Sequence, residues 1–338
     1  MNPPVNTPLR VAVIGGGQNS EHEVSLASAA SVAAALDGGR YEVVPLTIHR
    51  DGLWSGPGGS ALGPSVAESL AGAVGVLAGC DAVLPVVHGP RGEDGALAAL
   101  CDLAGVPYAG SPLRAGALGM DKWVTKLVAG AVGVATAPGR LVTRADLDSL
   151  GFDRPVVVKP VAAGSSHGVS LVRDAAGLRP ALEQALELDE RVLVEEVVTG
   201  REIDLAVAEL PGGELLISTP LEIVLDDGLF DTATKYDGSA RFVLSPAMGA
   251  DEHTALREAT ERVYRALGCR GLARVDFFLT QDGPVLNEVN TMPGMTDRSQ
   301  VPKMFGAQGW GYRALLETWL EAALSGASAQ GTARGTAA

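Results

Sequence analysis

Residues 272–290 carry the side chains with the clearest potential for chemistry. Apolar and β-branched residues flank a Gln-Asp-Gly sequence on both sides, which is typical of two strands joined by a tight turn. If the turn lies midway, Asp276 faces Glu288 across the strand pair. The same register places Arg274 opposite Asn290. Because side chains alternate along a strand, all four are expected on one face of the sheet.

Two carboxylates that face each other across a strand pair repel, so Asp276 and Glu288 require a cation between them. Oxygen donors from Asp, Glu and Asn, without His or Cys, suit Mg²⁺ or Mn²⁺ better than Zn²⁺. Mg²⁺ bound in this way usually also holds substrate phosphates, which indicates nucleoside triphosphate chemistry. The alternative is structural, with Asp276 facing solvent and Glu288 paired with Arg274.

Composition narrows the class of protein. A chain of 338 residues with 46 % hydrophobic residues is long enough for two or three domains. The formal net charge of −14 argues against a nucleic-acid partner and favours small-molecule ligands. Three cysteines without C-x-x-C spacing indicate neither a disulfide framework nor a zinc site. The chain lacks an apolar run of about 18–20 residues and a leader-like N-terminus, so we expect a cytoplasmic protein without membrane contact.

The N-terminal part predicts a parallel α/β sheet with a ligand site at its edge. An apolar strand, 9–14, runs into three glycines and a helix from about 20 to 36. Ser20 followed by Glu23 matches a capping box, so Ser20 is the expected N-cap and Glu21 lies in the first turn. Glu21 could hold the ammonium of a ligand or simply complement the helix dipole. A dinucleotide site is the weaker alternative, because Ser20 replaces the third glycine of G-x-G-x-x-G.

Loops that follow later strands supply further candidates. Strand 82–87 ends at His88, and open parallel sheets bind ligands at the carboxyl ends of strands, so His88 either lines that crevice or is structural. Lys159 precedes a loop of small residues, 162–168, which is not a Walker A loop because the lysine comes first and no helix follows. Such a flap still suits a polyphosphate, although an ordinary hairpin has the same pattern.

The second half of the chain adds an acidic strand and a long polar loop. Strand 192–198 turns acidic at Glu195, which could face an adenine or a ribose. The loop 226–238 carries Lys235 and Tyr236 and is long enough to act as a lid.

Short motifs occur along the chain in an order that is known from one enzyme family. They are GGG at 15–17, SEHEVS at 20–25, HG at 88–89, GEDG at 92–95, MDK at 120–122, VKP at 158–160, GSS at 164–166, KY at 235–236, RVD at 274–276 and NEVNTMPGMT at 287–296. Together they resemble the D-alanine–D-alanine ligases of the ATP-grasp superfamily over residues 9–325. The resemblance implies a three-domain α/β ATP-grasp fold with an N-terminal parallel-sheet (pre-ATP-grasp) domain.

The expected division of the chain follows from these patterns. The segments are an N-terminal α/β substrate domain (1–110), a central ATP-grasp subdomain with the glycine-rich flap (111–194), a C-terminal ATP-grasp domain with the metal site and lid (195–325), and a small, polar, disordered tail (326–338) after a helix that ends at 324.

The resemblance also implies a role for each candidate residue. For ATP, the implied residues are Lys122, Lys159, Ser166, Glu195, Val198, Glu202 and Lys235, and for two Mg²⁺ or Mn²⁺ ions they are Asp276, Glu288 and Asn290. For the amino acids, they are Glu21 at the ammonium of the first D-alanine, Ser165 and Tyr236 closing over it, His88 beside it, Arg274 at the developing oxyanion, and Gly294 with Ser299 at the carboxylate of the second D-alanine.

The implied reaction proceeds in two steps. The carboxylate of the first D-alanine takes the γ-phosphate of ATP, which releases ADP and forms an acyl phosphate. The amine of the second D-alanine then attacks the acyl carbon, and inorganic phosphate leaves. The flap and the lid would exclude water, which hydrolyses acyl phosphates. The product is D-alanyl-D-alanine for peptidoglycan synthesis, and we expect D-alanine and ATP as small-molecule partners of a homodimer.

Three positions depart from the family pattern. Ala163 stands where an acidic residue is frequent, His167 where a small aliphatic residue is frequent, and Gln300 where leucine is common. The first two could change how the flap closes, and Gln300 could change which second substrate is accepted. The Lys235-Tyr236 pair favours D-alanine. The alternatives are a ligase of the same fold that joins D-alanine to D-lactate or D-serine, a non-catalytic nucleotide-binding protein, and a nicotinamide-dependent dehydrogenase.

Overall fold

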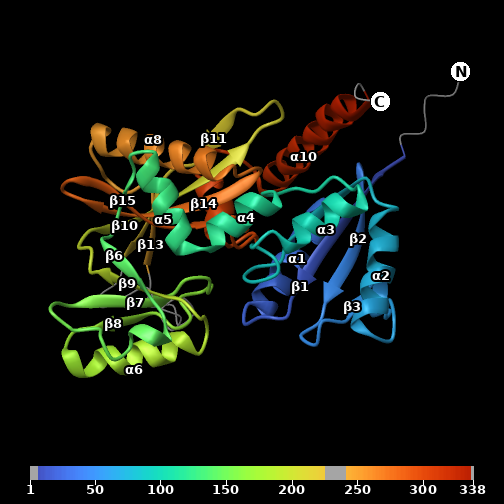
Figure 1. Ribbon diagram of the computed structural model, residues 1–338. Helices are drawn as coiled ribbons and strands as arrows, with labels where there is room; N and C mark the ends of the chain where they lie inside the picture. Colours follow the sequence, from blue (N-terminus) through green and yellow to red (C-terminus); the bar gives the residue numbers. More distant parts are fainter. Residues whose placement is uncertain (1–6, 225–240, 336–338) are drawn as a thin grey trace, which may run out of the picture.

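The computed structural model describes residues 7–224 and 241–335, with side chains through residue 326. The strands form three sheets, and helices pack against each of them. One sheet lies on one side of the molecule, and the other two lie one above the other on the opposite side (Figure 1). This mixed α/β architecture agrees with the predicted fold class.

The N-terminal sheet has the strand order β3-β2-β1-β4. Its parallel strands are β1 (Leu9–Gly16), β2 (Tyr41–Ile48) and β4 (Ala82–Pro85), and β3 (Trp54–Ser55) is an antiparallel edge strand. Strand β4 is wholly buried and β1 nearly so, as expected when helices cover both faces of a parallel sheet. The helices of this part are α1 (His22–Leu36), α2 (Val66–Leu77), α3 (Ala96–Ala104) and the short 3₁₀ helix η1 (Pro57–Gly59).

The start of α1 differs from the prediction. The N-cap is Glu21 and has no side-chain cap hydrogen bond, so the predicted capping box at Ser20 is wrong. Asn19 supplies the local hydrogen bonds instead. Its Oδ1 accepts from the backbone N–H of Glu21, and its Nδ2 donates to the carbonyl of His88, both at 2.8 Å. Asn19 therefore ties the loop before α1 to the loop after β4.

The second sheet is antiparallel, with the order β6-β9-β7-β8. Its strands are β6 (Gly139–Val142), β9 (Val192–Glu196), β7 (Val156–Pro160) and β8 (Ser170–Val172), and the 3₁₀ helix η2 (Arg144–Asp146) follows β6. Helix α6 (Ala175–Leu186) packs on this sheet and begins after Asp174, whose side chain accepts from the N–H of Gly177 at 3.0 Å. The small-residue loop 162–168 joins β7 to β8, as predicted for the flap.

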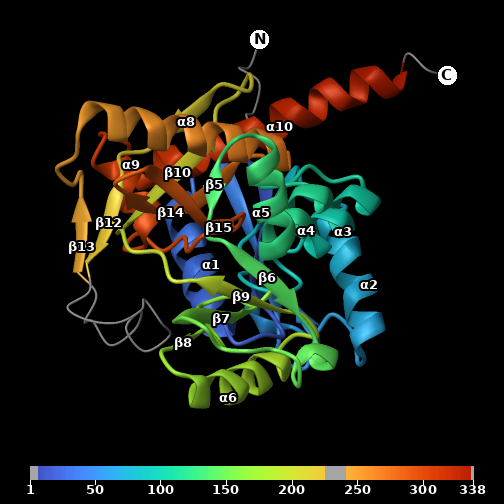
Figure 2. The same cartoon turned by 60° about the vertical axis from the view of Figure 1, so that its left-hand side comes forward.

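The third sheet has seven strands, with the main order β13-β12-β10-β14-β15-β5 and with β11 paired to β10. The strands are β13 (Arg241–Leu244), β12 (Leu221–Val224), β10 (Arg201–Glu209), β14 (Leu272–Thr280), β15 (Gly283–Asn290), β5 (Ala135–Thr136) and β11 (Leu215–Ile217). Helices α4 (Leu113–Met120), α5 (Lys122–Ala131) and α8 (Ala250–Leu267) pack together beside it (Figure 2). Helices α9 (Gln300–Gly306) and α10 (Tyr312–Gly335) also contact β10.

Three features differ from the predicted division of the chain. The stretch 113–136 was assigned to the central segment, but β5 pairs with β15 and α5 contacts α8, so this stretch packs on the third sheet. The predicted boundary at 194 falls inside β9. Helix α10 passes the predicted end at 324 and continues to Gly335, so the predicted disorder of the tail is wrong for that stretch.

A shared hydrophobic core joins the N-terminal sheet to the third sheet. Val32 and Leu36 of α1 belong to the same buried cluster as Leu272 of β14 and Trp319 of α10. Burial of such side chains is the main favourable term in folding. The cluster therefore holds one face of the N-terminal sheet against the third sheet.

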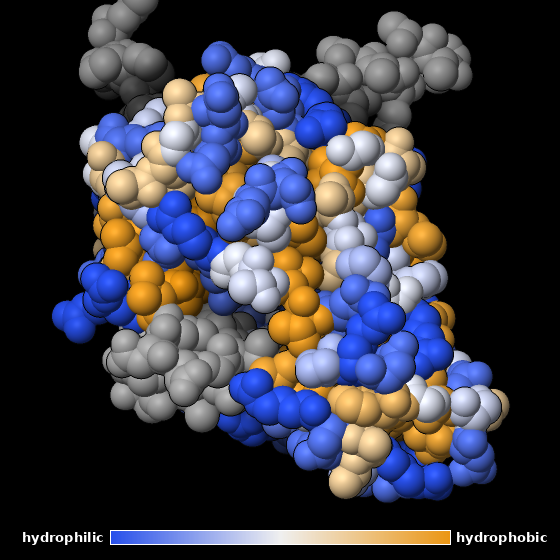
Figure 3. Space-filling model, turned by 90° about the vertical axis from the view of Figure 1, so that its left-hand side faces the viewer, coloured by the Kyte–Doolittle hydropathy of each residue, from blue (hydrophilic) through white to orange (hydrophobic). Residues whose placement is uncertain are grey.

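On the face drawn in Figure 3, hydrophilic residues lie between patches of apolar residues. Among the helices of the described residues, none combines the length and the apolar character that crossing a membrane requires.

We predict that Trp319→Ala lowers the free energy of unfolding by about 3–5 kcal/mol, because Trp319 is 2 % exposed and its removal leaves a cavity in the shared core. Urea denaturation followed by circular dichroism measures this change. Leu103→Ala is the control, since Leu103 is 88 % exposed, and we expect it to change stability by less than about 0.5 kcal/mol. Equal effects of the two substitutions would contradict the importance of this core.

Candidate active site

The β14–β15 hairpin has the predicted pairing at its polar end. Asp276 lies opposite Glu288, and Arg274 lies opposite Asn290. Near the turn the two strands pair one residue out of step with this register, and a β-bulge after Asp276 absorbs the difference. The prediction is therefore confirmed where the four polar side chains lie, although the ladder between them and the turn is interrupted.

The bulge also brings a residue to the site that the sequence did not reveal. The extra residue is Asn287. Its Oδ1 accepts a hydrogen bond from Nζ of Lys159 at 3.2 Å. Strict alternation would send Asn287 to the face opposite Glu288, so only a signal for the bulge could have identified it.

Protein cations offset the facing carboxylates. Nε and Nη2 of Arg274 donate to the two carboxylate oxygens of Asp276, each at 2.7 Å, in a bidentate pair. Nδ2 of Asn290 donates to Oδ2 of Asp276 at 3.0 Å. Nζ of Lys122 lies 3.3 Å from Oε2 of Glu288. The structural alternative is wrong, since Asp276 is only 3 % exposed and is itself the partner of Arg274.

The donor set on the hairpin fits a hard divalent cation. Asp276, Glu288 and Asn290 offer two carboxylates and one amide, which are oxygen ligands that Mg²⁺ and Mn²⁺ accept. Within the described residues, no group of three or more His, Cys, Asp and Glu side chains is arranged to hold a metal, so the amide is needed to complete the set. A metal here would share the oxygens of Asp276 with Arg274, and the metal role stays a prediction.

Asp204 on β10 is a third carboxylate beside this pair. It lies opposite Asp276 on the neighbouring strand and is fully buried. Its Oδ2 lies 3.5 Å from Nε of Arg274, and its Oδ1 has no hydrogen-bond partner. Burial, followed by the Asp276 carboxylate, raises the pKa of Asp204 well above its usual range, and Arg274 opposes this shift. The sequence marks an acidic strand here but gives Asp204 no role.

Glu21 lies against the flap. Oγ of Ser165 donates to Oε1 of Glu21 at 2.5 Å. A Cβ atom at Gly89 would lie 2.5 Å from Oε2 of Glu21, and one at Gly164 would lie 2.4 Å from it, so a side chain at either position would force this carboxylate to shift. Ser165 itself has a positive φ of 49°, which is uncommon for a residue other than glycine. The N-terminal loops and the flap thus enclose this carboxylate from two sides, and glycine at both positions lets it keep the place that it has here.

His88 connects the loop at Met292 to helix α1 through its two ring nitrogens. Nδ1 lies 2.8 Å from the carbonyl oxygen of Met292, and Nε2 lies 3.0 Å from Oγ of Ser28. A carbonyl only accepts, so Nδ1 carries the proton and Nε2 accepts from Ser28. Burial lowers the pKa of His88, so the ring is neutral at pH 7. The predicted place beside the first substrate stays open to His88, but both nitrogens already have protein partners.

A buried cluster of two lysines and one glutamate lies between α5 and the second sheet. Glu195 binds Lys126 through one carboxylate oxygen and Lys159 through the other, the latter at 2.6 Å. Burial alone would raise the pKa of Glu195, but the two ammonium groups outweigh it and lower that pKa. This carboxylate is thus occupied by lysines, and its contact with adenine stays a prediction.

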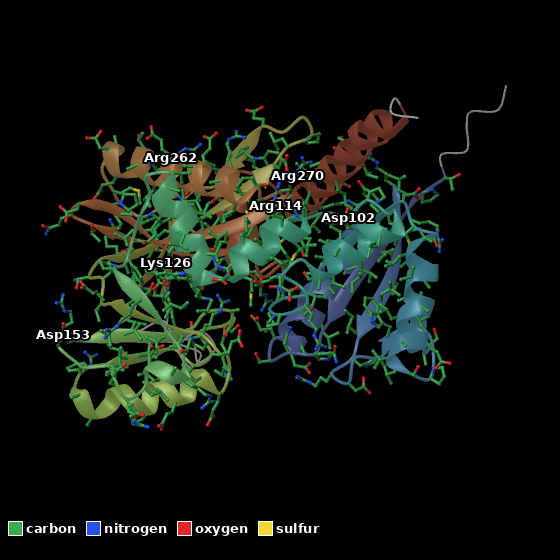
Figure 4. All side chains as sticks on the ribbon, viewed as in Figure 1. Asp102, Arg114, Lys126, Asp153, Arg262 and Arg270 are labelled. Atoms are coloured by element: carbon green, nitrogen blue, oxygen red, sulfur yellow. The ribbon has the colours of Figure 1, made fainter. Side chains whose placement is uncertain are left out.

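Lys126 is a further site residue that the sequence analysis missed. It extends from α5 toward the second sheet (Figure 4). The signal was available, because Lys122 and Lys126 lie one helical turn apart and therefore share a face of α5.

Two adjoining cavities contain the candidate residues. One of 400 Å³ lies between the second and third sheets, and one of 270 Å³ lies between the N-terminal loops, the flap and the hairpin. Both are lined by Lys122, Ala163, Arg274 and Glu288, so the polar face of the hairpin is their common wall. A separate cavity of 880 Å³ between α3, α8 and α10 contains none of the predicted site residues.

The other predicted residues divide between the two adjoining cavities. The 400 Å³ cavity is lined by Lys159, Ser166, Glu195, Val198, Glu202 and Asp276, and the 270 Å³ cavity by Glu21, His88, Ser165, Asn290, Gly294 and Ser299. At the start of α9, Oγ of Ser299 accepts from the N–H of Thr296 at 3.0 Å. Lys235 and Tyr236 lie outside the described residues.

The three departures from the family pattern also lie at these cavities. Ala163 contributes its carbonyl, which accepts from Nζ of Lys122 at 2.9 Å. His167 is exposed and borders the 400 Å³ cavity. Gln300 borders the 270 Å³ cavity and contacts Arg274. The flap therefore reaches Lys122 through its backbone, which does not depend on the side chain at position 163.

The layout now defines a class of protein. A parallel N-terminal sheet, a flap between two antiparallel strands, and an acidic hairpin on a second large sheet surround one composite cavity. This is the arrangement expected of an ATP-grasp ligase.

Comparison with known proteins identifies the family. Models described as D-ala D-ala ligase N-terminus and D-ala D-ala ligase C-terminus match residues 10–111 and 141–321. A D-alanine--D-alanine ligase of Mycobacterium sp. (strain KMS) is 42 % identical over 363 residues, which covers 95 % of this chain and 97 % of the relative. The chain therefore belongs to the D-alanine–D-alanine ligase family, as predicted.

Solved structures agree with this assignment. The VanG D-Ala:D-Ser ligase from Enterococcus faecalis matches with a TM-score of 0.79 at 30 % identity, covering 94 % of this chain and 99 % of that one. The D-alanine--D-alanine ligase from Bacillus anthracis complexed with ATP matches with a TM-score of 0.77 at 28 % identity, covering 95 % and 99 %. The predicted ATP-grasp fold and the prediction of an ATP-dependent ligase are confirmed.

Glu93 is a further acidic group of the 270 Å³ cavity that the sequence analysis did not single out. Its backbone carbonyl accepts from Oγ1 of Thr291 at 3.0 Å. Burial, followed by the carboxylate of Glu21, raises the pKa of Glu93 from 4.5 to about 8. In the unfolded chain this carboxyl loses its proton near its ordinary pKa, so between about pH 4.5 and 8 the folded state holds one more proton. Stability contributed by Glu93 is therefore lost as the pH rises through this window.

We predict that Glu93→Gln removes this loss. Relative to wild type, the variant gains about 1–3 kcal/mol in stability between pH 5 and pH 8.5, because a glutamine has no proton to lose. Thermal unfolding in metal-free buffer at several pH values measures the difference. Glu214→Gln, at an exposed position, is the control, and we expect it to follow wild type. A difference between Glu93→Gln and wild type that does not change with pH would contradict the raised pKa.

Proposed function

We propose that this chain joins two D-alanine molecules in an ATP-dependent reaction through an acyl phosphate, for peptidoglycan synthesis. Membership of the family supports the reaction class. The observation that carries the proposal is the polar face of the β14–β15 hairpin, which forms the common wall of the two cavities. A phosphate that is transferred from a nucleotide in one cavity to a carboxylate in the other would move along this polar face.

The 400 Å³ cavity is the proposed ATP site. Lys122 and Lys159 would offset phosphate charge, and Glu195 would keep Lys159 in place, since the two form a buried ion pair. Ser166, Val198 and Glu202 line the same cavity, where the last two would border the adenosine. Lys235 would add a third lysine to the phosphates, as the family resemblance implies.

Asp276, Glu288 and Asn290 would hold two Mg²⁺ or Mn²⁺ ions. When bound, such ions offset charge on the phosphates and polarise the transferred group. The protein's own cations already lie at the same oxygens, because Arg274 contacts Asp276 and Lys122 contacts Glu288. These two side chains would therefore remain next to the reacting phosphate on either side of the metal ligands.

The 270 Å³ cavity is the proposed amino-acid site. The carboxylate of Glu21 would bind the ammonium of the first D-alanine, while Ser165 holds that carboxylate from the flap. Tyr236 would close over it. Ser299, at the start of α9, and the backbone of Gly294 would bind the carboxylate of the second D-alanine, because a helix N-terminus favours an anion.

Arg274 would stabilise the oxyanion of the second step. Burial would lower its pKa, but Asp276 and the neighbouring carboxylates outweigh burial and raise it, so the guanidinium stays charged. Donors directed at a developing oxyanion typically contribute a few kcal/mol. His88 would support this site by holding the Met292 carbonyl, since its ring is neutral and both nitrogens are engaged.

The remaining expectations are proposals on the same footing. With a net charge of −14, the chain is expected to bind small molecules and no nucleic acid. A homodimer located in the cytoplasm without membrane contact stays a prediction.

The first test measures ATP-dependent phosphate release with Mg²⁺ and D-alanine, and identifies the product by mass spectrometry. We expect release with D-alanine alone, formation of D-alanyl-D-alanine, and none with L-alanine. If phosphate were released only in mixtures of D-alanine with D-serine or D-lactate, the proposed second substrate would change and D-alanine would remain the first substrate. Absence of release under all conditions would favour the non-catalytic nucleotide-binding protein.

Matched variants connect this activity to the hairpin. Asp276→Asn should reduce turnover to about 1 % or less, because it removes a charged ligand and the partner of Arg274. Asp282→Asn, in the exposed turn of the same hairpin, should leave turnover unchanged. Similar activity of the two variants would sink the proposed role of the polar face.

We predict that Glu21→Gln raises KM for the first D-alanine about 10- to 100-fold and leaves KM for ATP unchanged. The reason is that a charged hydrogen bond to the ammonium is replaced by a neutral one. Steady-state kinetics with varied D-alanine and ATP measures both constants. Glu23→Gln is the control, because Glu23 is exposed and pairs with Arg50 on the surface. An unchanged KM for D-alanine in Glu21→Gln would remove Glu21 from the ammonium site.

A further inference from the structure

Gln300 bridges two charged side chains that come from neighbouring strands. It is the first residue of α9. Its Oε1 accepts from Nη1 of Arg274 at 2.7 Å, and its Nε2 donates to Oδ2 of Asp204 at 3.4 Å. Asp204 and Arg274 lie on the paired strands β10 and β14. The amide of Gln300 therefore connects the start of α9 to both strands, through Arg274 on β14 and Asp204 on β10.

The three nitrogens of the Arg274 guanidinium are all engaged. Nε and Nη2 bind the carboxylate of Asp276, and Nη1 binds Gln300. Since a guanidinium has five N–H groups in a fixed plane, these contacts hold three of them and determine where the other two point. Both Arg274 and Gln300 line the 270 Å³ cavity. A planar group held at both ends cannot turn about its Cδ–Nε bond without breaking a contact.

A neutral acceptor suits this position for an electrostatic reason. Arg274 already faces two carboxylates, at Asp276 and Asp204. A third carboxylate would further offset the positive charge of the guanidinium, whereas an amide oxygen accepts its hydrogen bond and leaves the charge available. An aliphatic side chain would leave Nη1 without an acceptor in a largely buried place, where an unpaired donor is costly.

We propose that Gln300 is a positioning residue that fixes the guanidinium plane of Arg274 for the oxyanion of the second step. This inference rests on the function proposed above. Asp276 fixes one edge of the guanidinium and Gln300 fixes the other, so that the free N–H groups are directed into the amino-acid cavity. When Asp276 shares its oxygens with a metal, Gln300 retains its own contact with Arg274, because its amide oxygen is outside the ligand set.

The test is a double-mutant cycle of Gln300→Met and Arg274→Lys, with dipeptide formation as the readout. Methionine keeps the length of glutamine and removes the acceptor. We expect Gln300→Met to lower kcat about 10- to 100-fold with KM for ATP unchanged, because misorientation of a catalytic group carries a penalty of this size. In the Arg274→Lys background the same substitution should lower kcat by less than about twofold, since lysine has no plane to orient.

Binding provides a readout that is independent of turnover. A phosphinate analogue of D-alanyl-D-alanine, which carries a negative oxygen in tetrahedral geometry, is titrated by calorimetry without ATP or metal. We expect Gln300→Met to weaken this binding about 10-fold or more and to leave the affinity for D-alanine unchanged. Gln308→Met is the matched control, because Gln308 donates one hydrogen bond to the carbonyl of Ile217 from an exposed position beside α9.

The outcomes separate the inference from its rivals. An equal loss of kcat in both backgrounds would overturn it, because Gln300 would then act on a substrate directly. A change confined to KM for the second D-alanine, or to the preference over D-serine, would also overturn it. If Gln300→Met lowered the melting temperature more than Gln308→Met, the phosphinate affinity of Gln300→Leu would be measured in addition, and an affinity equal to that of the wild type would overturn the inference. A wild-type chain without dipeptide formation would refute the proposed function, whereas an active wild type with an unaffected Gln300→Met would refute only this inference.

Discussion

The bidentate pair between Arg274 and Asp276 is the interaction on which the rest of the site depends. Three carboxylates, Asp204, Asp276 and Glu288, lie on three consecutive strands of one sheet, where like charges repel. The guanidinium contacts two of them and Lys122 contacts the third. These cations reduce the repulsion between the carboxylates, although Arg274 does not cancel the rise in the pKa of Asp204. The positive charges thus favour pairing of the strands and are also the proposed means of offsetting charge on a reacting phosphate.

These cations reach the hairpin from different parts of the fold. Lys122 begins α5. Lys159 lies near the end of β7 of the second sheet, where Glu195 binds it in a buried cluster that also includes Lys126. Burial makes such a cluster costly to disrupt, because removal of one partner leaves an unpaired charge in a place of low dielectric. The second sheet therefore contributes a fixed arrangement of charge to a cavity whose other wall belongs to the third sheet.

The amino-acid side of the site depends on close approach of backbone to a carboxylate. Gly89 and Gly164 leave the room that Glu21 occupies, and Ser165 closes the contact from the flap. The shared hydrophobic core around Trp319 holds the N-terminal sheet against the hairpin, so that this carboxylate and Arg274 border one cavity. Gln300 adds a last connection, from α9 to the guanidinium. Packing far from the cavity and polar contacts within it thus both hold Glu21 and Arg274 in their positions around the cavity.

The sequence by itself determined what depends on local pattern. Alternation along 272–290 placed the polar side chains on one face, and the motifs identified the family, the flap and most cavity residues. Only the tertiary structure decided which cation meets which carboxylate, because Lys126, Asp204 and Gln300 reach their partners from distant segments. It also placed Asn287 at the site, since a bulge breaks the period of two. The start of α1 followed the same rule, because contacts of Asn19 with a distant loop prevailed over the local capping signal of Ser20.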